Sequence, residues 1–276
     1  MEIIVQALIM GIVQGLTEFV PVSSSGHLVI VPYLFDWHDP FLTSLAFSVM
    51  LHLGTLVALL AYFRSDWRRL VPAGLAAARD RSFGNDPERR LAWLLVAATI
   101  PAALAGLLFD KAIESQFGEV GRVAVMLVVG GLILFVADRI GRRDRPIARI
   151  TLPVAVGIGA AQALALIPGI SRSGISISAG RLAGLDRPAA ARFAFLMATP
   201  ITAGAILFEA RKLVAGEAGV DVSIGPLLVG MIAALVSGLA AIHFMLRFLQ
   251  TRSLDLFVAY RLVLAGVVLV AWLGLR

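Results

Sequence analysis

Residues 14–27 restrict the possible folds of this chain most strongly, because they place polar groups in a segment that otherwise suits hydrocarbon. The stretch reads Gln-Gly-Leu-Thr-Glu-Phe-Val-Pro-Val-Ser-Ser-Ser-Gly-His, and apolar residues flank it on both sides. Pro21 and the serine run break a helix here. Broken backbone at membrane depth is tolerated only where protein or a water-filled cavity surrounds it. The stretch therefore predicts a re-entrant helical hairpin with arms at residues 3–22 and 27–34.

The composition supports a membrane protein. Hydrophobic residues make up 59% of the chain, and only 24 Lys/Arg and 18 Asp/Glu occur among 276 residues. A soluble core does not need so much apolar material. The net charge of +6 comes mostly from arginines in short loops, which indicates membrane orientation rather than nucleic-acid binding. The absence of cysteine excludes a disulfide framework and Cys-ligated zinc.

Apolar runs of about 20 residues can span a bilayer. Six runs are predicted as full spans: residues 41–63, 91–109, 123–136, 193–208, 224–248 and 256–275. Residues 150–167 and 175–185 predict a second re-entrant hairpin, which Pro168-Gly169 and the following Ser-Arg-Ser-Gly interrupt. Residues 64–90 and 138–149 are predicted as Arg-rich loops, and the positive-inside rule places both in the cytoplasm. We therefore expect an all-α integral membrane protein with six transmembrane helices, two re-entrant hairpins and both termini outside.

The two interrupted runs indicate an internal repeat. Gln14 precedes Ser-Ser-Ser-Gly by the same spacing that separates Gln162 from Ser-Arg-Ser-Gly. A second echo pairs Ala-Thr-Ile-Pro101 and Phe109-Asp110 with Ala-Thr-Pro200 and Phe208-Glu209. One hairpin would enter from each side, so the repeats would have inverted topology and discontinuous helices that meet near the midplane and bind ligand there. The predicted repeats cover about 1–122 and 150–223, and residues 123–149 and 224–276 complete a single domain over 1–276.

Ionisable residues inside a membrane are costly and point to function. Gln14 and Glu18 lie four residues apart, so they share one helix face. Glu18 needs a cation nearby in so low a dielectric, either Arg172 or a divalent metal between Glu18 and a phosphate. His27 follows a flexible glycine and has the chemistry of a general acid or base near neutral pH.

Two serine-rich turns offer groups that bind phosphate. The first offers hydroxyls and backbone N–H groups from four residues: Ser23, Ser24, Ser25 and Gly26. The second offers them from three residues at the start of a helical arm, where the dipole favours an anion: Ser171, Ser173 and Gly174. We therefore predict one phosphate-handling site where the two hairpins meet.

Structural roles compete with this interpretation. Glu18 could pair with an arginine only to hold the bundle, and serine runs often let membrane helices approach each other. His52 and His243 stand alone on apolar faces, and we interpret both as structural. Arg261, after Tyr260 in the last span, must be neutralised or must snorkel or cap a neighbouring helix. Function is favoured because an acid, an imidazole, a guanidinium and two anion-binding turns occur at matching places in the repeats.

The motifs Gln-x3-Glu with Pro-Val-Ser-Ser-Ser-Gly-His, and Pro-Gly-Ile-Ser-Arg-Ser-Gly-Ile-Ser, closely resemble the two signatures of the bacterial undecaprenyl-diphosphate phosphatases, the bacitracin-resistance proteins. The resemblance extends over nearly the whole chain. It implies an inner-membrane hydrolase that converts undecaprenyl diphosphate to the monophosphate and phosphate. This reaction recycles the lipid carrier for peptidoglycan synthesis and confers bacitracin resistance. The resemblance also implies a divalent cation, Mg²⁺ or Ca²⁺, and a site that faces the periplasm.

Carried over by position, the resemblance implies catalytic roles for Glu18, Ser24, His27 and Arg172. It implies substrate or phosphate contacts for eight further residues: Gln14, Ser23, Ser25, Gly26, Ser171, Ser173, Gly174 and Ser176. Gln14 stands where the family has Glu or Gln and supplies no carboxylate, so Glu18 is the expected acidic metal ligand. Ser176 replaces a terminal Thr and keeps the hydroxyl. The nucleophile stays open between Ser24, with a phosphoenzyme, and a water activated by His27 or Glu18.

Two other functions compete. Phosphatidic-acid-type lipid phosphatases share Ser-Gly-His and Ser-Arg, but they need a downstream His with an Asp four residues later, and residues 175–186 contain no His. A polyprenyl-phosphate transporter or flippase also suits an inverted repeat with broken helices, and it is kept as the alternative. The expected partners are a polyprenyl diphosphate lipid and membrane lipids rather than nucleic acid, and a homodimer is left open.

Overall fold

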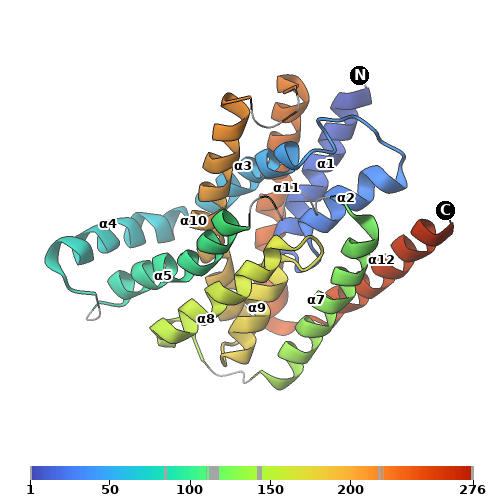
Figure 1. The fold of residues 1–276 in the computed structure, drawn as a ribbon. Helices are drawn as coiled ribbons and strands as arrows, with labels where there is room; N and C mark the ends of the chain where they lie inside the picture. Colours follow the sequence, from blue (N-terminus) through green and yellow to red (C-terminus); the bar gives the residue numbers. More distant parts are fainter. Residues whose placement is uncertain are drawn as a thin grey trace.

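The computed structural model describes residues 2–83, 86–109, 111, 118–141, 145–216, 219 and 221–274. Within these ranges the chain is built from helices in the order α1 Glu2–Phe19, α2 Ser24–Leu34, α3 Leu45–Tyr62, α4 Arg64–Asp80, α5 Pro87–Leu108, α7 Val120–Ile140, η1 Ile147–Arg149, α8 Leu152–Ala163, η2 Leu164–Leu166, α9 Arg172–Leu182, α10 Arg187–Val214, α11 Ile224–Thr251 and α12 Asp255–Gly274. Figure 1 shows α4 and α5 extending to one side of the other helices. The predicted all-α fold is confirmed.

Seven of the described helices are long and apolar enough to cross a membrane. Six of them cover the six predicted spans: α3, α5, α7, α10, α11 and α12. The seventh is α1, the first arm of the first predicted hairpin. Its 18 residues give a length of about 27 Å, close to the thickness of a hydrocarbon core. The matching arm α8 has only 12 residues before η2, so the two hairpins have arms of different length.

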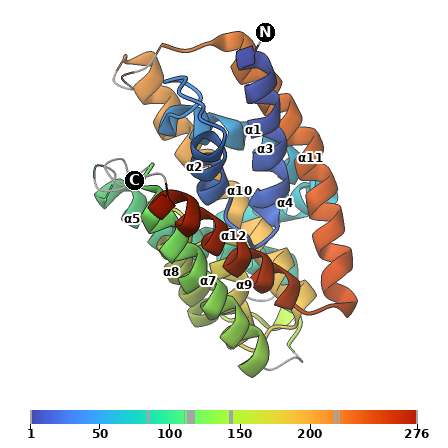
Figure 2. The same ribbon diagram turned by 90° about the vertical axis from the view of Figure 1, so that its right-hand side faces the viewer.

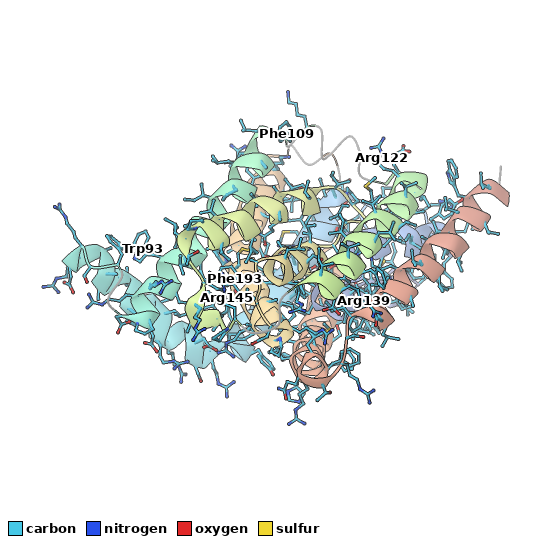
Figure 3. All side chains as sticks on the ribbon, turned by 90° about the horizontal axis from the view of Figure 1, so that it is seen from below. Trp93, Phe109, Arg122, Arg139, Arg145 and Phe193 are labelled. Atoms are coloured by element: carbon cyan, nitrogen blue, oxygen red, sulfur yellow. The ribbon has the colours of Figure 1, made fainter. Side chains whose placement is uncertain are left out.

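Residues 64–80 form helix α4, so the prediction of a loop over 64–90 is wrong for this part. Leu70 and Ala77 are seven residues apart and buried on one face, while the arginines project from the rest of the surface. Trp93 of α5 donates a hydrogen bond to the Gly74 carbonyl at 3.1 Å and so ties the two helices together. Figure 3 labels Trp93 on this α4–α5 pair. Three predicted features lie outside the described residues: Asp110, residues 142–144 and the end of the last span at Leu275.

Both predicted helix breaks are present, and they share one backbone geometry. α1 ends at Phe19 before α2, and α8 gives way to η2 before α9. Ser23 and Ser171, the residues that precede α2 and α9, both have φ of 78°. This value lies in the left-handed region that non-glycine residues rarely adopt. The spacing repeat found in the sequence therefore marks two turns of the same conformation.

Each of these serines also caps the helix that follows it. The Ser23 hydroxyl accepts a hydrogen bond from the Gly26 N–H at 3.3 Å, and the Ser171 hydroxyl accepts one from the Gly174 N–H at 3.1 Å. An N-cap side chain satisfies one of the N–H groups that the first helical turn leaves unpaired. The caps therefore fix the start of α2 and of α9.

The helices of one half of the chain pack against helices of the other half. A Cβ on Gly11 would overlap the Gly230 carbonyl of α11, and a Cβ on Gly159 would overlap the Ala98 carbonyl of α5. Without side chains at these points, α1 lies along α11 and α8 lies along α5, while α3 packs on α10 and α7 on α12 (Figures 1 and 2). This exchange of partners brings the tips of the two hairpins together.

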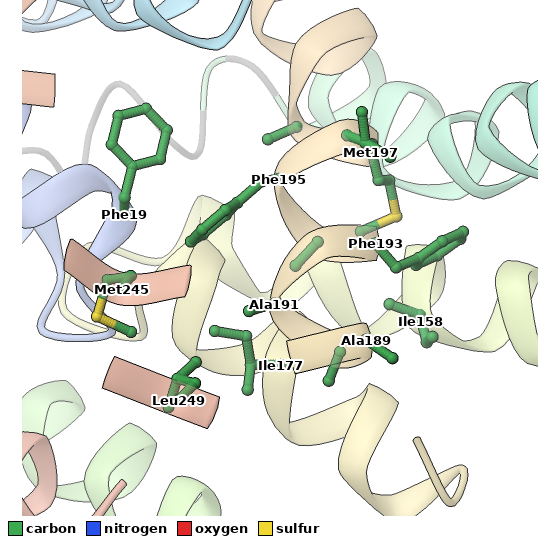
Figure 4. Packing of buried hydrophobic residues seen from close by; sticks show 14 of the residues in the cluster. Phe19, Ile158, Ile177, Ala189, Ala191, Phe193, Phe195, Met197, Met245 and Leu249 are labelled. Atoms are coloured by element: carbon green, nitrogen blue, oxygen red, sulfur yellow. The ribbon is translucent and has the colours of Figure 1, made fainter. Parts of the chain in front are cut away.

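A buried apolar cluster lies beside the hairpin tips. Phe19, the last residue of α1, meets Phe195 of α10 edge to face, with ring centroids 5.5 Å apart. Figure 4 shows both rings together with Ile177 of α9 and Met245 of α11, which belong to the same cluster. The end of the first arm is thus packed against helices of the second half of the chain.

Candidate functional site

The candidate site lies where the tips of the two hairpins touch. The Ser173 hydroxyl, in the first turn of α9, donates to the Val20 carbonyl in the first break at 3.2 Å. These two residues are 153 positions apart in the chain. The predicted meeting of the two interrupted segments is therefore present in the structure.

Glu18 is the centre of this contact. Its side chain is 6% exposed and lies in the last turn of α1. The Glu18 Oε2 atom accepts hydrogen bonds from Ser24 Oγ at 2.5 Å and from Gln14 Nε2 at 3.0 Å. Its Oε1 atom is 3.0 Å from Arg172 Nη2. Four residues that the sequence predicts for one site are thus in direct contact around one carboxylate.

Arg172 is held from two sides. Besides its ion pair with Glu18, its Nη1 atom donates to Thr202 Oγ1 of α10 at 2.6 Å. The Arg172 side chain is 21% exposed, so it is the more accessible partner of the pair. A planar guanidinium with N–H groups left over suits recognition of a phosphate.

His52 of α3 also faces Glu18, so the prediction that it stands alone on an apolar face is wrong. His52 Nε2 is 3.3 Å from Glu18 Oε2, and its Nδ1 is 2.8 Å from the Ser48 carbonyl. Both ring nitrogens of His52 thus face acceptors, namely the Glu18 carboxylate and the Ser48 carbonyl. The spacing of residues in the sequence could not predict this contact. Only the presence of an ionisable His within an apolar span pointed to a partner for it. His243, by contrast, contacts the Tyr62 hydroxyl at 3.3 Å on the exposed surface.

His27 is buried, and its ring contacts the first break and α12. Its Nδ1 is 2.7 Å from the Ser23 carbonyl, and its Nε2 is 2.8 Å from the Tyr260 hydroxyl of α12. Both ring nitrogens are therefore engaged. Among the described contacts no hydrogen bond or ion pair joins His27 to Glu18, so the structure places this predicted catalytic residue next to the site rather than in it.

The predicted phosphate-binding serines fall into two groups. Ser24 and Ser25 are partly exposed, whereas Ser23, Ser171, Ser173 and Ser176 are buried. The Ser171 hydroxyl is 3.2 Å from that of Ser173, and the Ser23 hydroxyl is 3.4 Å from that of Ser25. The buried hydroxyls at the two turns are thus largely engaged in holding those turns. The Gly26 and Gly174 N–H groups donate to the capping serines, so the other first-turn N–H groups of α2 and α9 that lack intrahelical acceptors are the ones suited to an anion.

Three further buried polar side chains lie on α8, α9 and α10. The side chains of Gln162, Ser176 and Thr199 are buried, and polar atoms of each have no hydrogen-bond partner among the described residues. Ser176 follows Arg172 by one turn of α9, and Thr199 precedes Thr202 by one turn of α10. Ser176 thus lies one turn away from the Glu18 cluster.

The site contains few metal ligands. No group of three or more His, Cys, Asp or Glu side chains that could hold a metal occurs in the described ranges. The buried Gln14 Oε1 atom is unpartnered there, and it stands next to the Glu18 carboxylate. Magnesium is usually bound by one or two carboxylates together with substrate phosphates. Glu18 and Gln14 therefore fit a cation that the substrate helps to hold, rather than one bound by protein alone.

Comparison with known proteins shows a relationship over almost the whole chain. The family described as "Bacitracin resistance protein BacA" matches residues 7–267. The chain is 44% identical over 271 residues to the "Undecaprenyl-diphosphatase" of Moorella thermoacetica, with 98% of each chain covered. It is 45% identical over 271 residues to the protein of the same name from Gemmatimonas aurantiaca, again with 98% coverage of both. A Thermomicrobium roseum protein of that name is 45% identical over 276 residues, with 96% coverage of both.

Proposed function

We propose, on the premise that this chain belongs to the bacitracin resistance protein BacA family, that it is a membrane-bound undecaprenyl-diphosphatase. The reaction is hydrolysis of undecaprenyl diphosphate to undecaprenyl phosphate and inorganic phosphate. The observation that supports this most directly is the buried Glu18 carboxylate held between the hydroxyl of Ser24 and the guanidinium of Arg172. An acid, a hydroxyl and a fixed cation at one point suit phosphoryl transfer, which depends mainly on positioning and electrostatic stabilisation.

In our proposal Ser24 is the nucleophile. Its hydroxyl lies 2.5 Å from Glu18 Oε2, within reach for proton transfer to a general base. Ser24 Oγ would form a bond to the terminal phosphorus while the bond from that phosphorus to the bridging oxygen breaks. Undecaprenyl phosphate leaves with the bridging oxygen, and the Ser24 proton passes to Glu18. Water then attacks the phosphoserine phosphorus as its bond to Ser24 Oγ breaks, Glu18 returns the proton to Ser24 Oγ, and inorganic phosphate leaves.

Arg172 and the first-turn N–H groups of α2 and α9 bind the diphosphate in this scheme. Arg172 would exchange part of its contact with Glu18 for phosphate oxygens, and Thr202 keeps the guanidinium oriented. His27 supports the first turn through the Ser23 carbonyl. A divalent cation, Mg²⁺ or Ca²⁺, would be held by Glu18, Gln14 Oε1 and the substrate, and it would supply charge neutralisation for the leaving phosphate.

The chemistry is tested by phosphate release from undecaprenyl diphosphate by purified protein. Rapid quench with substrate labelled in the terminal phosphate should trap label on the protein, and Ser24→Ala should remove it. Absence of a labelled protein at any time during turnover would exclude the covalent route and favour direct attack by water. Arg172→Ala should abolish hydrolysis while the protein stays folded.

We further propose that the protein lies in the bacterial inner membrane with both termini and the opening of the site on the periplasmic side. Asp138 of α7 pairs with Arg181 of α9 and Arg187 of α10, so the Arg-rich ends of these helices lie together. α1 runs parallel to α11, so the N-terminus lies at the start of α11. α12 begins next to Asp138 at the Arg-rich end and runs away from that end. Both observations support termini on the side opposite the Arg-rich end. The positive-inside rule then assigns the Arg-rich end to the cytoplasm.

The chain offers a clean test of orientation because it contains no cysteine. Single cysteines at Asp36 and Arg252 should react with an impermeant thiol reagent from opposite sides of sealed inverted and right-side-out vesicles. Reaction of both from the same side would contradict this topology.

The inverted repeat over about 1–122 and 150–223, and a homodimer, remain predictions. The names of the relatives do not favour the flippase alternative.

A further inference from the structure

Arg261 of α12 is wholly buried, and its guanidinium contacts both helix breaks. Its Nη1 atom donates to the Pro21 carbonyl at 3.2 Å and to the Ile170 carbonyl at 3.1 Å. Its Nη2 atom donates to the Gly169 carbonyl at 2.7 Å and again to Ile170 at 3.1 Å. In the part of the chain that the structure describes, no carboxylate forms an ion pair with Arg261. Backbone carbonyls thus hold this buried charge in place.

The carbonyls that Arg261 binds occupy matching positions in the two hairpins. Pro21 precedes the cap Ser23 by two residues, and Gly169 precedes the cap Ser171 by two residues. One side chain therefore holds the same point of both turns. Each of these turns leads directly into the helix whose first residue contacts Glu18.

α7 supplies the other side of the Arg261 pocket. Arg261 Nε donates to the Leu127 carbonyl at 3.0 Å, and Nη2 also reaches the Met126 carbonyl at 3.3 Å. A Cβ on Gly130 would overlap Arg261 Nη2 directly, whereas a Cβ on Gly131 would stand 3.6 Å from the nearest Arg261 atom. Glycine at 130 is thus required for the guanidinium to lie where it does, and glycine at 131 is not.

From these contacts we propose that Arg261 is a positioning residue of the diphosphate site. It fixes the separation of Ser24 and Arg172 by binding the turns in front of both, and it places a positive charge without a carboxylate partner behind the two phosphate-binding turns. The inference rests on the proposed function, because the distance that matters is the one between the nucleophile and the phosphate-binding guanidinium.

The test combines a substitution of Arg261 with one that displaces it. Arg261→Lys keeps the charge, but its single ammonium has three N–H donors in place of the five of the guanidinium, so it cannot keep all the contacts to the two breaks and to α7. Gly130→Ala leaves Arg261 in the chain and crowds both its Nη2 atom and the Ile170 carbonyl that it binds. Gly131→Ala is the matched control, with the same chemical change one residue further along the same helix. For each variant kcat, KM and Tm are measured in detergent, with undecaprenyl diphosphate as the substrate.

We expect Arg261→Lys and Gly130→Ala to lose about 100-fold in kcat, the cost of misplacing reacting groups by about 1 Å. Their KM should stay near the wild-type value, and the loss of kcat should be present at temperatures at which both variants are still folded. Gly131→Ala should behave as wild type throughout. Inhibition by inorganic phosphate separates charge from position. Phosphate inhibition should persist in Arg261→Lys, which keeps the positive charge, and weaken in Arg261→Gln, which removes it.

Normal kcat in both Arg261→Lys and Gly130→Ala, with an active wild type, would overturn the positioning role. A loss of activity that only follows a loss of Tm would also overturn it, in favour of a general structural role. If the wild-type protein releases no phosphate from undecaprenyl diphosphate, the proposed function itself fails. The two failures are therefore distinguishable.

Discussion

Ser24 and Arg172 lie at the first residues of α2 and α9 and hold opposite oxygens of the same carboxylate. Ser24 Oγ is 2.5 Å from Glu18 Oε2, and Arg172 Nη2 is 3.0 Å from Glu18 Oε1. The two residues stand at the same position after their capping serines, yet one is a hydroxyl and the other a cation. The two turns thus share a backbone conformation and differ in the chemistry that they present.

Replacement of Glu18 by Gln should reduce kcat by about 100- to 10,000-fold, the usual contribution of a positioned general base. The amide keeps the shape of the side chain and can still accept from Ser24, but it cannot take the proton. Phosphate release from undecaprenyl diphosphate measures the effect. Glu2→Gln, at the exposed start of the same helix, is the control and should be fully active. Activity near wild type in Glu18→Gln would rule out the carboxylate as the base.

His52→Leu should lower kcat/KM by about 10- to 100-fold, because it removes a hydrogen bond to a charged group worth about 1.5–3 kcal/mol. His243→Leu removes the other histidine of an apolar span, which lies away from Glu18, and should leave kcat/KM unchanged. Steady-state kinetics of the two variants side by side decide the matter. Equal behaviour of the pair would show that the contact of His52 with Glu18 has no catalytic consequence.

Thr199→Val should change the stability and Thr202→Val the activity, although the two residues are one turn apart on α10. The buried Thr199 hydroxyl has no partner among the described residues, so its removal should raise the stability by about 1 kcal/mol. Thr202 accepts the hydrogen bond from Arg172, so its removal should lower kcat. Thermal unfolding in detergent and phosphate release measure the two quantities. A loss of Tm in Thr199→Val would mean that water or another group satisfies this hydroxyl in the membrane.

Asp138→Ala should destabilise the protein by about 3–5 kcal/mol, the cost of breaking a buried ion pair from one side. Asp138 accepts from Arg181 Nε at 3.2 Å, from Arg187 Nε at 2.8 Å and from the Leu254 N–H at 3.2 Å. Asp255→Ala removes an ion pair with Arg139 that is about half exposed, and such pairs contribute about 0–1 kcal/mol. Denaturant or thermal unfolding of the two variants provides the comparison. Similar unfolding curves for both would show that the Asp138 network is solvated.

The motifs predicted the breaks and the core of the site because both depend on short-range chemistry. Ser23 and Ser171 each precede a glycine by three residues, which is the spacing of the cap hydrogen bond that the structure contains. Gln14 and Glu18 share a helix face by simple periodicity. The need of Glu18 for a cation led to Arg172, although the contact between them depends on the whole fold.

The contacts of His52 and Arg261 could not be predicted from the sequence. Their contacts depend on how α3 and α12 pack, and no local spacing encodes that packing. Arg261 binds only backbone carbonyls, so no complementary side chain in the sequence could have revealed its partners. The sequence did not predict α4 for another reason. Its many charged residues are typical of a loop, and only two of its positions, Leu70 and Ala77, are buried. His27 was correctly placed near the first break, but its ring faces Tyr260, which only the tertiary structure determines.

The contact between the two hairpin tips has a consequence for how the protein is made. Val20 and Ser173 are 153 residues apart, so at ribosomal rates of 5–20 residues per second the second tip follows the first by roughly 8–30 s. During that interval the nascent chain carries the Glu18 carboxylate without its guanidinium. A carboxylate without its partner is costly at membrane depth, so synthesis of the second hairpin removes a cost that the first hairpin carries until then.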